Sequence, residues 1–290
     1  MAAGEIPDPF FRENELALQW VGKTRWTYSR SFDVPTRLLR CNRVLLRCEG
    51  LDTLATITIN GRHLARTDNM FRRYEFDAKE LLREGADNTI AVRFDSPLPT
   101  MKKRQAERSL QGWYERDGRS WVRKEPCNFG WDWGPKLITC GIWRGIEIVG
   151  FDGARLVDVA ISQDHAKRGE VGLSVAAEAE KTRRGKLSLA VTVSSRGRKV
   201  AHETVVFSGK KACAELTIKK PRLWWPAGMG EQPLYDVRVE LVDAKGHAVN
   251  RQDKRIGLRT LRLARDKDRW GESFAFVVNG MAFFAKGANW

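Results

Sequence analysis

The chain has 290 residues, of which 42% are hydrophobic and 30% charged, and its formal net charge is +15. This length suits about two domains, and this composition is typical of a soluble globular protein and excludes a disordered chain. No stretch approaches the roughly 18 apolar residues of a membrane-spanning helix, and no secretory signal is visible at the N-terminus. We therefore expect no membrane partner and a cytoplasmic location.

Five cysteines are present, an odd number with no CxxC spacing, at positions 41, 48, 127, 140 and 213. This usage favours reduced thiols over a disulfide framework. The four histidines are scattered, and none lies at metal-ligand spacing from a cysteine, so we infer no metal site and no cofactor.

Strand patterns dominate residues 1–150. Apolar and polar residues alternate over 52–68 around Asn60-Gly61, which is a strong hairpin signal, and further strands are predicted over RVLLRCEG and NTIAVRFDSP. Between Asp77, a candidate cap, and Gly85, a candidate terminator, one short helical turn is predicted. We predict an all-β jelly-roll sandwich over 1–150.

Residues 98–128 have weak periodicity and many charges. They predict a long loop, and loops of this length in a compact domain are usually functional or mobile.

Seven short strand patterns separated by turn residues follow over 154–263, which predicts an immunoglobulin-like β-sandwich. They are LVDVAISQ, VGLSVAAEAE, KLSLAVTVSS, HETVVFSG, AELTIKK, YDVRVELVD and KRIGLRTLRL.

A third segment covers 264–290. It predicts a hairpin around Asn279-Gly280, followed by an apolar strand that ends in KGANW. Such a strand needs neighbours to cover it, so the segment is expected to be the start of a further domain.

The stretch FGWDWGP, residues 129–135, brackets one carboxylate, Asp132, with Trp131 and Trp133. A sugar ring offers apolar C–H faces to aromatic side chains and hydroxyl groups to a carboxylate, so this combination suits carbohydrate binding. The alternative is that both tryptophans belong to the core and Asp132 caps a turn. If the segment is extended, Trp131 and Trp133 share one side and only one indole lies near the sugar.

The excess of positive charge also permits a nucleic-acid-binding protein. The basic residues are spread along the chain, and no RRM, KH, zinc-finger or recognition-helix pattern accompanies them. We favour solvated strand faces and expect no nucleic-acid partner.

Segments along essentially the whole chain resemble the N-terminal region of β-mannosidases of the family 2 glycoside hydrolases. The segments are IPDPF, NELALQWVGKTRWTY, LRCEGLDTLATITING, RTDNMFRRYEFD, VRKEPCNFGWDWGPKL, GIWRGIEI, PRLWWPAGMGEQPLY, RIGLRTLRL and FFAKGANW.

The resemblance implies a jelly-roll sugar-binding domain, an immunoglobulin-like domain and the truncated start of a catalytic (β/α)₈ barrel, with FFAKGANW as its first strand. It also implies a β-mannoside substrate and a loop whose Asp132 contacts the bound mannose. The catalytic carboxylates would lie in the missing barrel, so none is expected in this chain, and Glu15 is interpreted as structural or solvated. Asn289 and Trp290, at a barrel-strand end, are further candidate substrate contacts.

Three departures from the family pattern stand out. Only MAAGE precedes IPDPF, Ala282 occupies a position that is usually proline, and the sequence ends at Trp290. A stand-alone carbohydrate-binding module remains the alternative to part of an enzyme, and FFAKGANW argues against it.

Overall fold

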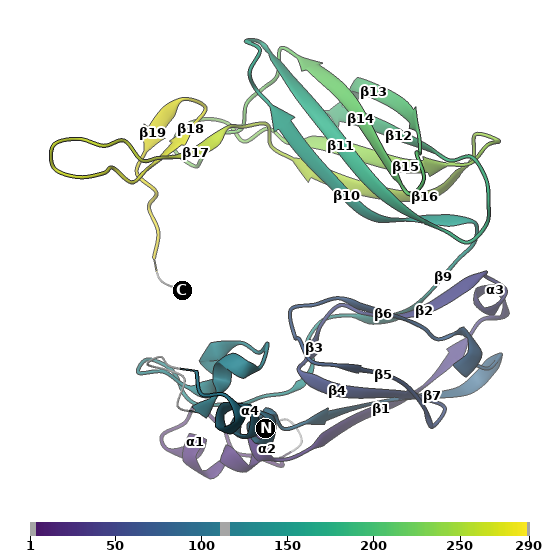
Figure 1. Cartoon of the computed structure of the whole chain (residues 1–290), viewed down its shortest axis with the longest axis vertical. Coiled ribbons are helices and arrows are strands. Elements are labelled where there is room, and N and C mark those ends of the chain that lie inside the picture. The colour runs from purple at the N-terminus through teal and green to yellow at the C-terminus, as the bar shows by residue number, and fades with distance from the viewer. Residues whose placement is uncertain (1–3, 111–116, 289–290) are drawn as a thin grey trace. The chain divides into compact units, whose positions relative to one another are not determined.

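The computed structural model describes residues 4–110 and 117–288, and the chain divides into two compact units after Phe151 (Figure 1). Most of the regular structure is strand, and every pairing between named strands is antiparallel. The predicted all-β fold class is confirmed.

The first unit contains two main sheets, with strand orders β1-β7-β4-β5 and β6-β2-β9, and a short β3-β8 pair. The strands are β1 (Trp26–Val34), β2 (Arg43–Cys48), β3 (Leu51–Asp52), β4 (Leu54–Ile59), β5 (Arg62–Thr67), β6 (Tyr74–Asp77), β7 (Gly85–Asp95), β8 (Gly141–Ile142) and β9 (Ile146–Phe151).

Alternation along the strands builds the core of this sandwich. Ala55, Ile57 and Ile59 on β4 point inward, where they pack with Leu46 of β2 and Phe94 of β7. Period-two alternation places one face of each strand against the facing sheet, as the sequence pattern predicts. The predicted hairpin joins β4 to β5, and both Asn60 (φ 51°) and Gly61 (φ 75°) have the positive φ that such a turn requires.

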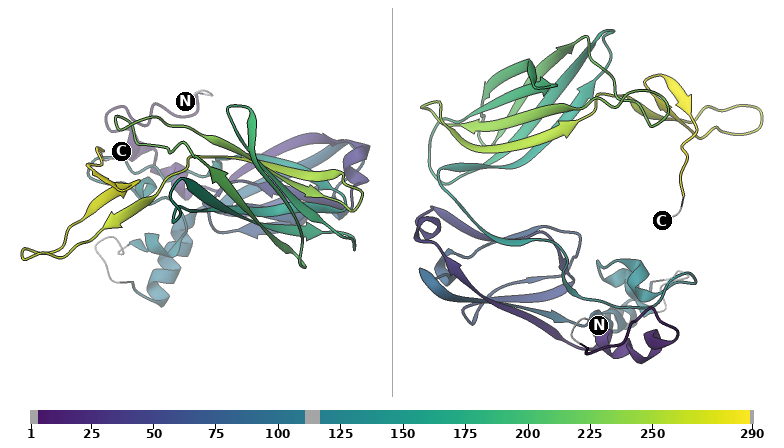
Figure 2. Two further views of the ribbon diagram at one scale, coloured as in Figure 1. Left: turned by 90° about the horizontal axis from the view of Figure 1, so that it is seen from above. Right: turned by 180° about the vertical axis from the view of Figure 1, so that it is seen from behind.

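Short helices gather at one end of this unit, and the α3 turn lies at the other (Figure 1, Figure 2). The helices of the unit are α1 (Asn14–Ala17), α2 (Gln19–Lys23) and α4 (Pro97–Glu107) at the first end and α3 (Thr36–Leu39) at the second, and its 3₁₀ turns are η1 (Lys79–Leu81), η3 (Arg119–Trp121) and η4 (Pro126–Phe129). The predicted turn after Asp77 is η1, where the Asp77 carboxylate accepts a hydrogen bond from Lys79 N–H. No helix of the described residues is long and apolar enough to cross a membrane.

The prediction of a loop from Leu98 onward was wrong over α4. Ser96 caps this helix by accepting the Leu98 N–H, and proline occupies its first turn. Met101 is buried beneath the helix with Val122, Phe129 and Ile138. The helix is therefore stabilised by capping and by contacts with distant residues, since its own apolar periodicity is weak.

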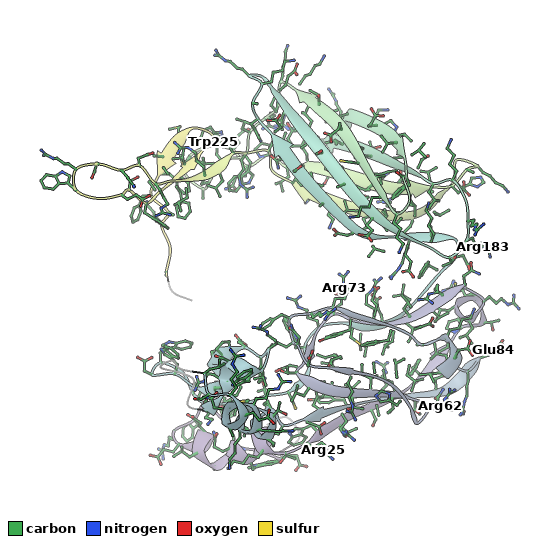
Figure 3. The ribbon with its side chains drawn as sticks, in the orientation of Figure 1. Arg25, Arg62, Arg73, Glu84, Arg183 and Trp225 are labelled. Carbon is green, nitrogen blue, oxygen red and sulfur yellow. The ribbon has the colours of Figure 1, made fainter. Side chains whose placement is uncertain are left out.

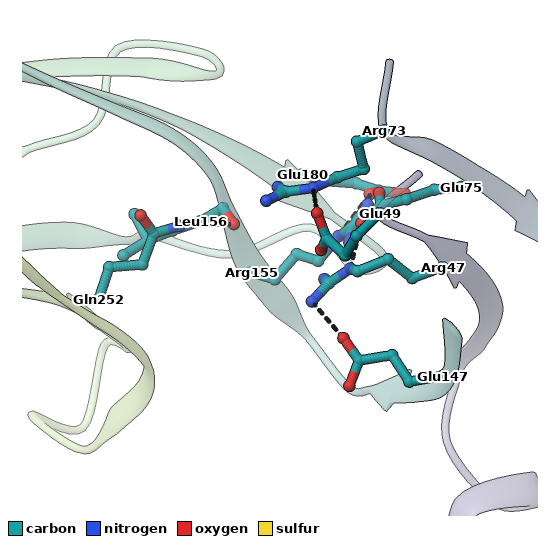
Figure 4. Close-up of polar contacts among 9 residues, drawn as sticks. All are labelled: Arg47, Glu49, Arg73, Glu75, Glu147, Arg155, Leu156, Glu180 and Gln252. Carbon is teal, nitrogen blue, oxygen red and sulfur yellow. Dashed lines mark hydrogen bonds and ion pairs between the residues drawn. The ribbon is translucent and has the colours of Figure 1, made fainter. Parts of the chain in front are cut away.

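Charges on the strand surfaces are paired across the sheets (Figure 4). On β2, Arg47 lies opposite Glu75 of β6 and Glu147 of β9 and contacts both, at 2.8 and 3.2 Å. In the second unit, Arg155 pairs with the facing Glu180 at 2.8 Å. Opposite charges on neighbouring strands favour this register.

The second unit is a sandwich of two antiparallel sheets, β10-β11-β14 and β13-β12-β15-β16. Its strands are β10 (Ala154–Asp164), β11 (Glu170–Lys181), β12 (Ser188–Ser195), β13 (Arg198–Val206), β14 (Lys211–Lys219), β15 (Tyr235–Val242) and β16 (Ala248–Ile256). Alternate valines, leucines and alanines of both sheets form one continuous core. This seven-stranded arrangement is the predicted immunoglobulin-like sandwich.

The seventh predicted strand, KRIGLRTLRL, is two strands in the structure. β16 ends at Ile256, and β17 (Leu261–Ala264) begins after a break and joins a separate sheet with β18 (Ala275–Val278) and β19 (Met281–Phe283). The break contains Gly257, which lies against the Trp224 indole so closely that a Cβ there would be 2.8 Å from Trp224 Cγ. This contact between residues far apart in sequence explains the error.

The turn of the β18–β19 hairpin is bonded to the sandwich. Asn279, at φ 48°, exchanges hydrogen bonds with the backbone of Thr260 through its N–H and its side-chain oxygen, at 3.2 and 3.0 Å. Its side-chain nitrogen donates to the Trp224 carbonyl at 3.0 Å. Trp225 marks this junction in Figure 3.

Residues 284–288, all described, form no strand, although FFAKGANW was expected to be one. A strand of a parallel sheet needs neighbouring strands for its hydrogen bonds, and none pairs with this segment in the structure.

Candidate functional site

The FGWDWGP segment forms a tight reversal at the helical end of the first unit. Trp131 N–H donates to the Gly134 carbonyl at 3.0 Å, and Gly134 N–H donates back to Trp131 at 3.4 Å. Gly130 enters the reversal at φ 84°, and a Cβ there would lie 3.0 Å from the Lys136 Cβ. The segment is therefore not extended, and the expectation that Trp131 and Trp133 share one side of a strand does not apply.

The reversal exposes all three of its candidate binding residues. Trp131 is 42% exposed and Trp133 is 74% exposed, so neither belongs to the core. Asp132 is exposed, and its carboxylate has no hydrogen bond or ion pair with any residue that the structure describes. It does not cap the turn, because the reversal is closed by backbone groups alone.

A buried ion pair supports the segment that leads into this reversal. Lys124 is 4% exposed and Asp52, at the end of β3, is 5% exposed. The Lys124 ammonium donates to Asp52 Oδ2 at 2.5 Å and to the Thr139 carbonyl at 2.7 Å. The Thr53 hydroxyl donates to the other oxygen of Asp52. A buried charge is tolerated only when it is paired and hydrogen-bonded, as both are here.

Residues of α1 and α2 hold the segment that leaves the reversal. The Glu15 carboxylate accepts the Lys136 N–H at 2.7 Å, and the Gln19 side chain donates to the Lys136 carbonyl at 2.8 Å. The interpretation of Glu15 as a structural residue is confirmed by this contact. Both ends of the reversal are thereby fixed, and rigid support of this kind reduces the entropy lost on binding a ligand.

The predicted and observed site residues differ in part. The structure brings Trp131, Asp132 and Trp133 together, while Asn289 and Trp290 lie outside the described residues. Sequence reasoning missed Lys124 and Asp52, and no local pattern marks them as partners because they are 72 residues apart in sequence. Among the described residues, no three His, Cys, Asp or Glu side chains gather as a metal site.

The geometry suits recognition of a neutral polar ligand. An unpaired carboxylate beside exposed indoles accepts hydrogen bonds from hydroxyl groups while the aromatic faces cover C–H groups. The reversal offers one carboxylate, whereas hydrolysis of a glycosidic bond ordinarily uses two.

Two family models match the chain. Residues 1–144 match the glycosyl hydrolase 2 galactose-binding domain-like family, and residues 154–259 match glycosyl hydrolases family 2. The chain belongs to family 2 of the glycosyl hydrolases.

Proteins that are similar to the chain over its whole length include β-mannosidases. It is 32% identical to the β-mannosidase B of Emericella nidulans over all of this chain and 34% of that protein. It is 37% identical to the β-D-mannosidase of Dictyoglomus thermophilum, with a TM-score of 0.92 over all of this chain and 36% of that structure. An exo-chitosanase from Amycolatopsis orientalis shares the fold at 20% identity, with a TM-score of 0.70 over 97% of this chain and 31% of that structure. The chain thus spans about a third of the length of the relatives it matches.

Proposed function

We propose that the chain is the non-catalytic sugar-recognition part of a retaining β-mannosidase, which removes terminal non-reducing β-D-mannose from β-mannosides. In this proposal Trp131, Asp132 and Trp133 contact the mannose, and Asn289 and Trp290 contribute from the far end of the chain. In this proposal the two carboxylates that the reaction uses, the nucleophile and the acid/base, belong to a (β/α)₈ barrel outside this chain. They would lie at the carboxyl ends of the barrel strands, where barrel enzymes have their active sites.

The exposed, unpartnered Asp132 on a rigidly supported reversal carries the proposal. A carboxylate that accepts a sugar hydroxyl contributes roughly 1.5–3 kcal/mol, and more if the bond shortens in the transition state. It binds and orients the sugar and takes no part in bond cleavage. The free state of all five cysteines supports a reducing, cytoplasm-like compartment.

Steady-state kinetics on an aryl β-mannoside test the proposal in the enzyme that contains this chain and its barrel. Asp132→Ala is expected to lower kcat/KM by about ten- to several-hundredfold without a change in melting temperature. Asp33→Ala, which removes an exposed carboxylate from β1, is the matched control and should leave kinetics unchanged. Wild-type kinetics for Asp132→Ala would exclude a role of this carboxylate in substrate binding.

Trp131→Ala and Trp133→Ala extend the test to the aromatic side chains. Both indoles are exposed, so neither substitution should unfold the first unit, and the indole that covers the sugar should raise KM when it is removed. Loss of stability without a change in KM would instead assign both tryptophans to packing.

A further inference from the structure

A cleft lies beside the reversal in the first unit and shares Trp131 with it. Its walls include Phe71, Arg119, Ser120, Arg123, Pro126 and Trp131. Its volume of about 380 Å³ falls within the range of small-ligand sites.

Two aromatic side chains are exposed at this cleft. Phe71 is 60% exposed and Trp131 is 42% exposed. Exposed aromatic faces of this kind pack well on the C–H faces of sugar rings.

The position of Phe71 is fixed by its neighbours. Its N–H donates to the Asn69 side chain at 2.9 Å, and the adjacent Met70 N–H donates to the Arg123 carbonyl at 3.0 Å. The Trp143 indole N–H donates to the Met70 carbonyl at 3.0 Å. The backbone at Phe71 and Arg123 is therefore held in place before any ligand arrives, which favours binding.

Of the positively charged side chains at the cleft, two are paired with carboxylates and one is not paired with any described carboxylate. Arg119 pairs with Asp117 at 2.8 Å, and Lys124 pairs with the buried Asp52. Arg123 is exposed and has no carboxylate partner in the part of the chain that the structure describes. A guanidinium group left unpaired beside aromatic faces suits a planar anion, which it can bind through two parallel hydrogen bonds.

We propose that this cleft is a subsite for a sugar residue that carries a carboxylate, such as a uronic acid linked to the mannose. Phe71 and Trp131 cover the ring, and Arg123 pairs with the carboxylate. This inference depends on the proposed β-mannosidase function, because the shared Trp131 makes the cleft continuous with the mannose-binding reversal.

Competing substrates test the subsite. The full-length enzyme is assayed with mannosyl-β-1,4-glucuronate and with mannosyl-β-1,4-glucose, and the ratio of the two kcat/KM values is measured. Arg123→Gln is expected to lower the preference for the glucuronate about ten- to a hundredfold, because one charge-assisted contact is lost. Arg198→Gln, an exposed arginine of β13 with no carboxylate partner among the described residues, should leave the ratio unchanged. An unchanged ratio in Arg123→Gln would overturn the subsite.

Direct binding separates failure of the subsite from failure of the proposed function. The 290-residue chain is titrated with both disaccharides while its tryptophan fluorescence is followed, in the wild type, Arg123→Gln and Phe71→Ala. Tighter binding of the glucuronate that is lost in Arg123→Gln supports the subsite even if the full-length enzyme hydrolyses no mannoside. Phe71→Ala is expected to weaken both disaccharides, since stacking does not depend on charge. If Arg123→Gln instead abolished binding of a single-stranded DNA oligonucleotide and left the disaccharides unaffected, the cleft would not be a sugar subsite.

Discussion

Removal of the Lys124 ammonium should destabilise the first unit more than any surface ion pair could. In Lys124→Met the Asp52 carboxylate, 5% exposed, keeps only the Thr53 hydroxyl as a side-chain donor among the described residues, and the Thr139 carbonyl loses a hydrogen bond. Breaking a buried pair in this way costs about 3–5 kcal/mol. For a unit of this size, that corresponds to a fall in melting temperature of about 6–20 °C.

A double variant tests the reasoning. Asp52→Asn combined with Lys124→Met removes both buried charges while keeping an acceptor for Thr53, so it should be more stable than Lys124→Met alone. The control is Arg25→Met, which breaks the Arg25–Asp95 pair at the surface (Figure 3 labels Arg25) and should change stability by less than about 1 kcal/mol. Thermal and urea unfolding of all variants provide the comparison. Equal losses for Lys124→Met and Arg25→Met would show that the buried pair contributes no more than a solvated one.

Three further outcomes are expected. The 290-residue chain alone should not hydrolyse an aryl β-mannoside, and turnover above the blank would mean that it contains carboxylates of its own for the reaction. Burial raises the pKa of Cys48 to about 12 and that of Cys140 to about 11, and the Asp52 charge adds to the rise at Cys140. Both thiols should therefore resist a thiolate-specific reagent at pH 8 and react only as the pH rises toward those values. The exposed Cys127 and Cys213 should be labelled first, and rapid labelling of all five would contradict the burial. Binding to DNA should be weak and vanish near physiological salt, and submicromolar affinity there would favour a nucleic-acid partner.

Local sequence signals predicted the strands and hairpins well. Asn60-Gly61 and Asn279-Gly280 both form the turns expected of them, because the positive φ of such turns is a property of the residues themselves. Alternation along β4 and β11 also reports directly which face is buried.

Features that depend on distant partners could not be predicted in the same way. The α4 helix is stabilised by burial of Met101 against residues that follow it, and the break after Ile256 depends on Trp224. At the candidate site, the motif identified Asp132, whereas its support comes from Asp52, which is 72 residues away from Lys124 in sequence. No local pattern contains that information.

The hydrogen bonds of Asn279 have a mechanical consequence for the end of the chain. A single short connector after β16 would act as a hinge, yet the Asn279 side chain donates a hydrogen bond across it to the Trp224 carbonyl, while its two bonds with Thr260 extend the pairing of β17 with β18. At about 0.5–1.5 kcal/mol, the bond to Trp224 resists rotation of the β17–β19 sheet about that connector. The sandwich therefore restricts the direction in which the polypeptide leaves β19, because Asn279 limits twisting at the connector.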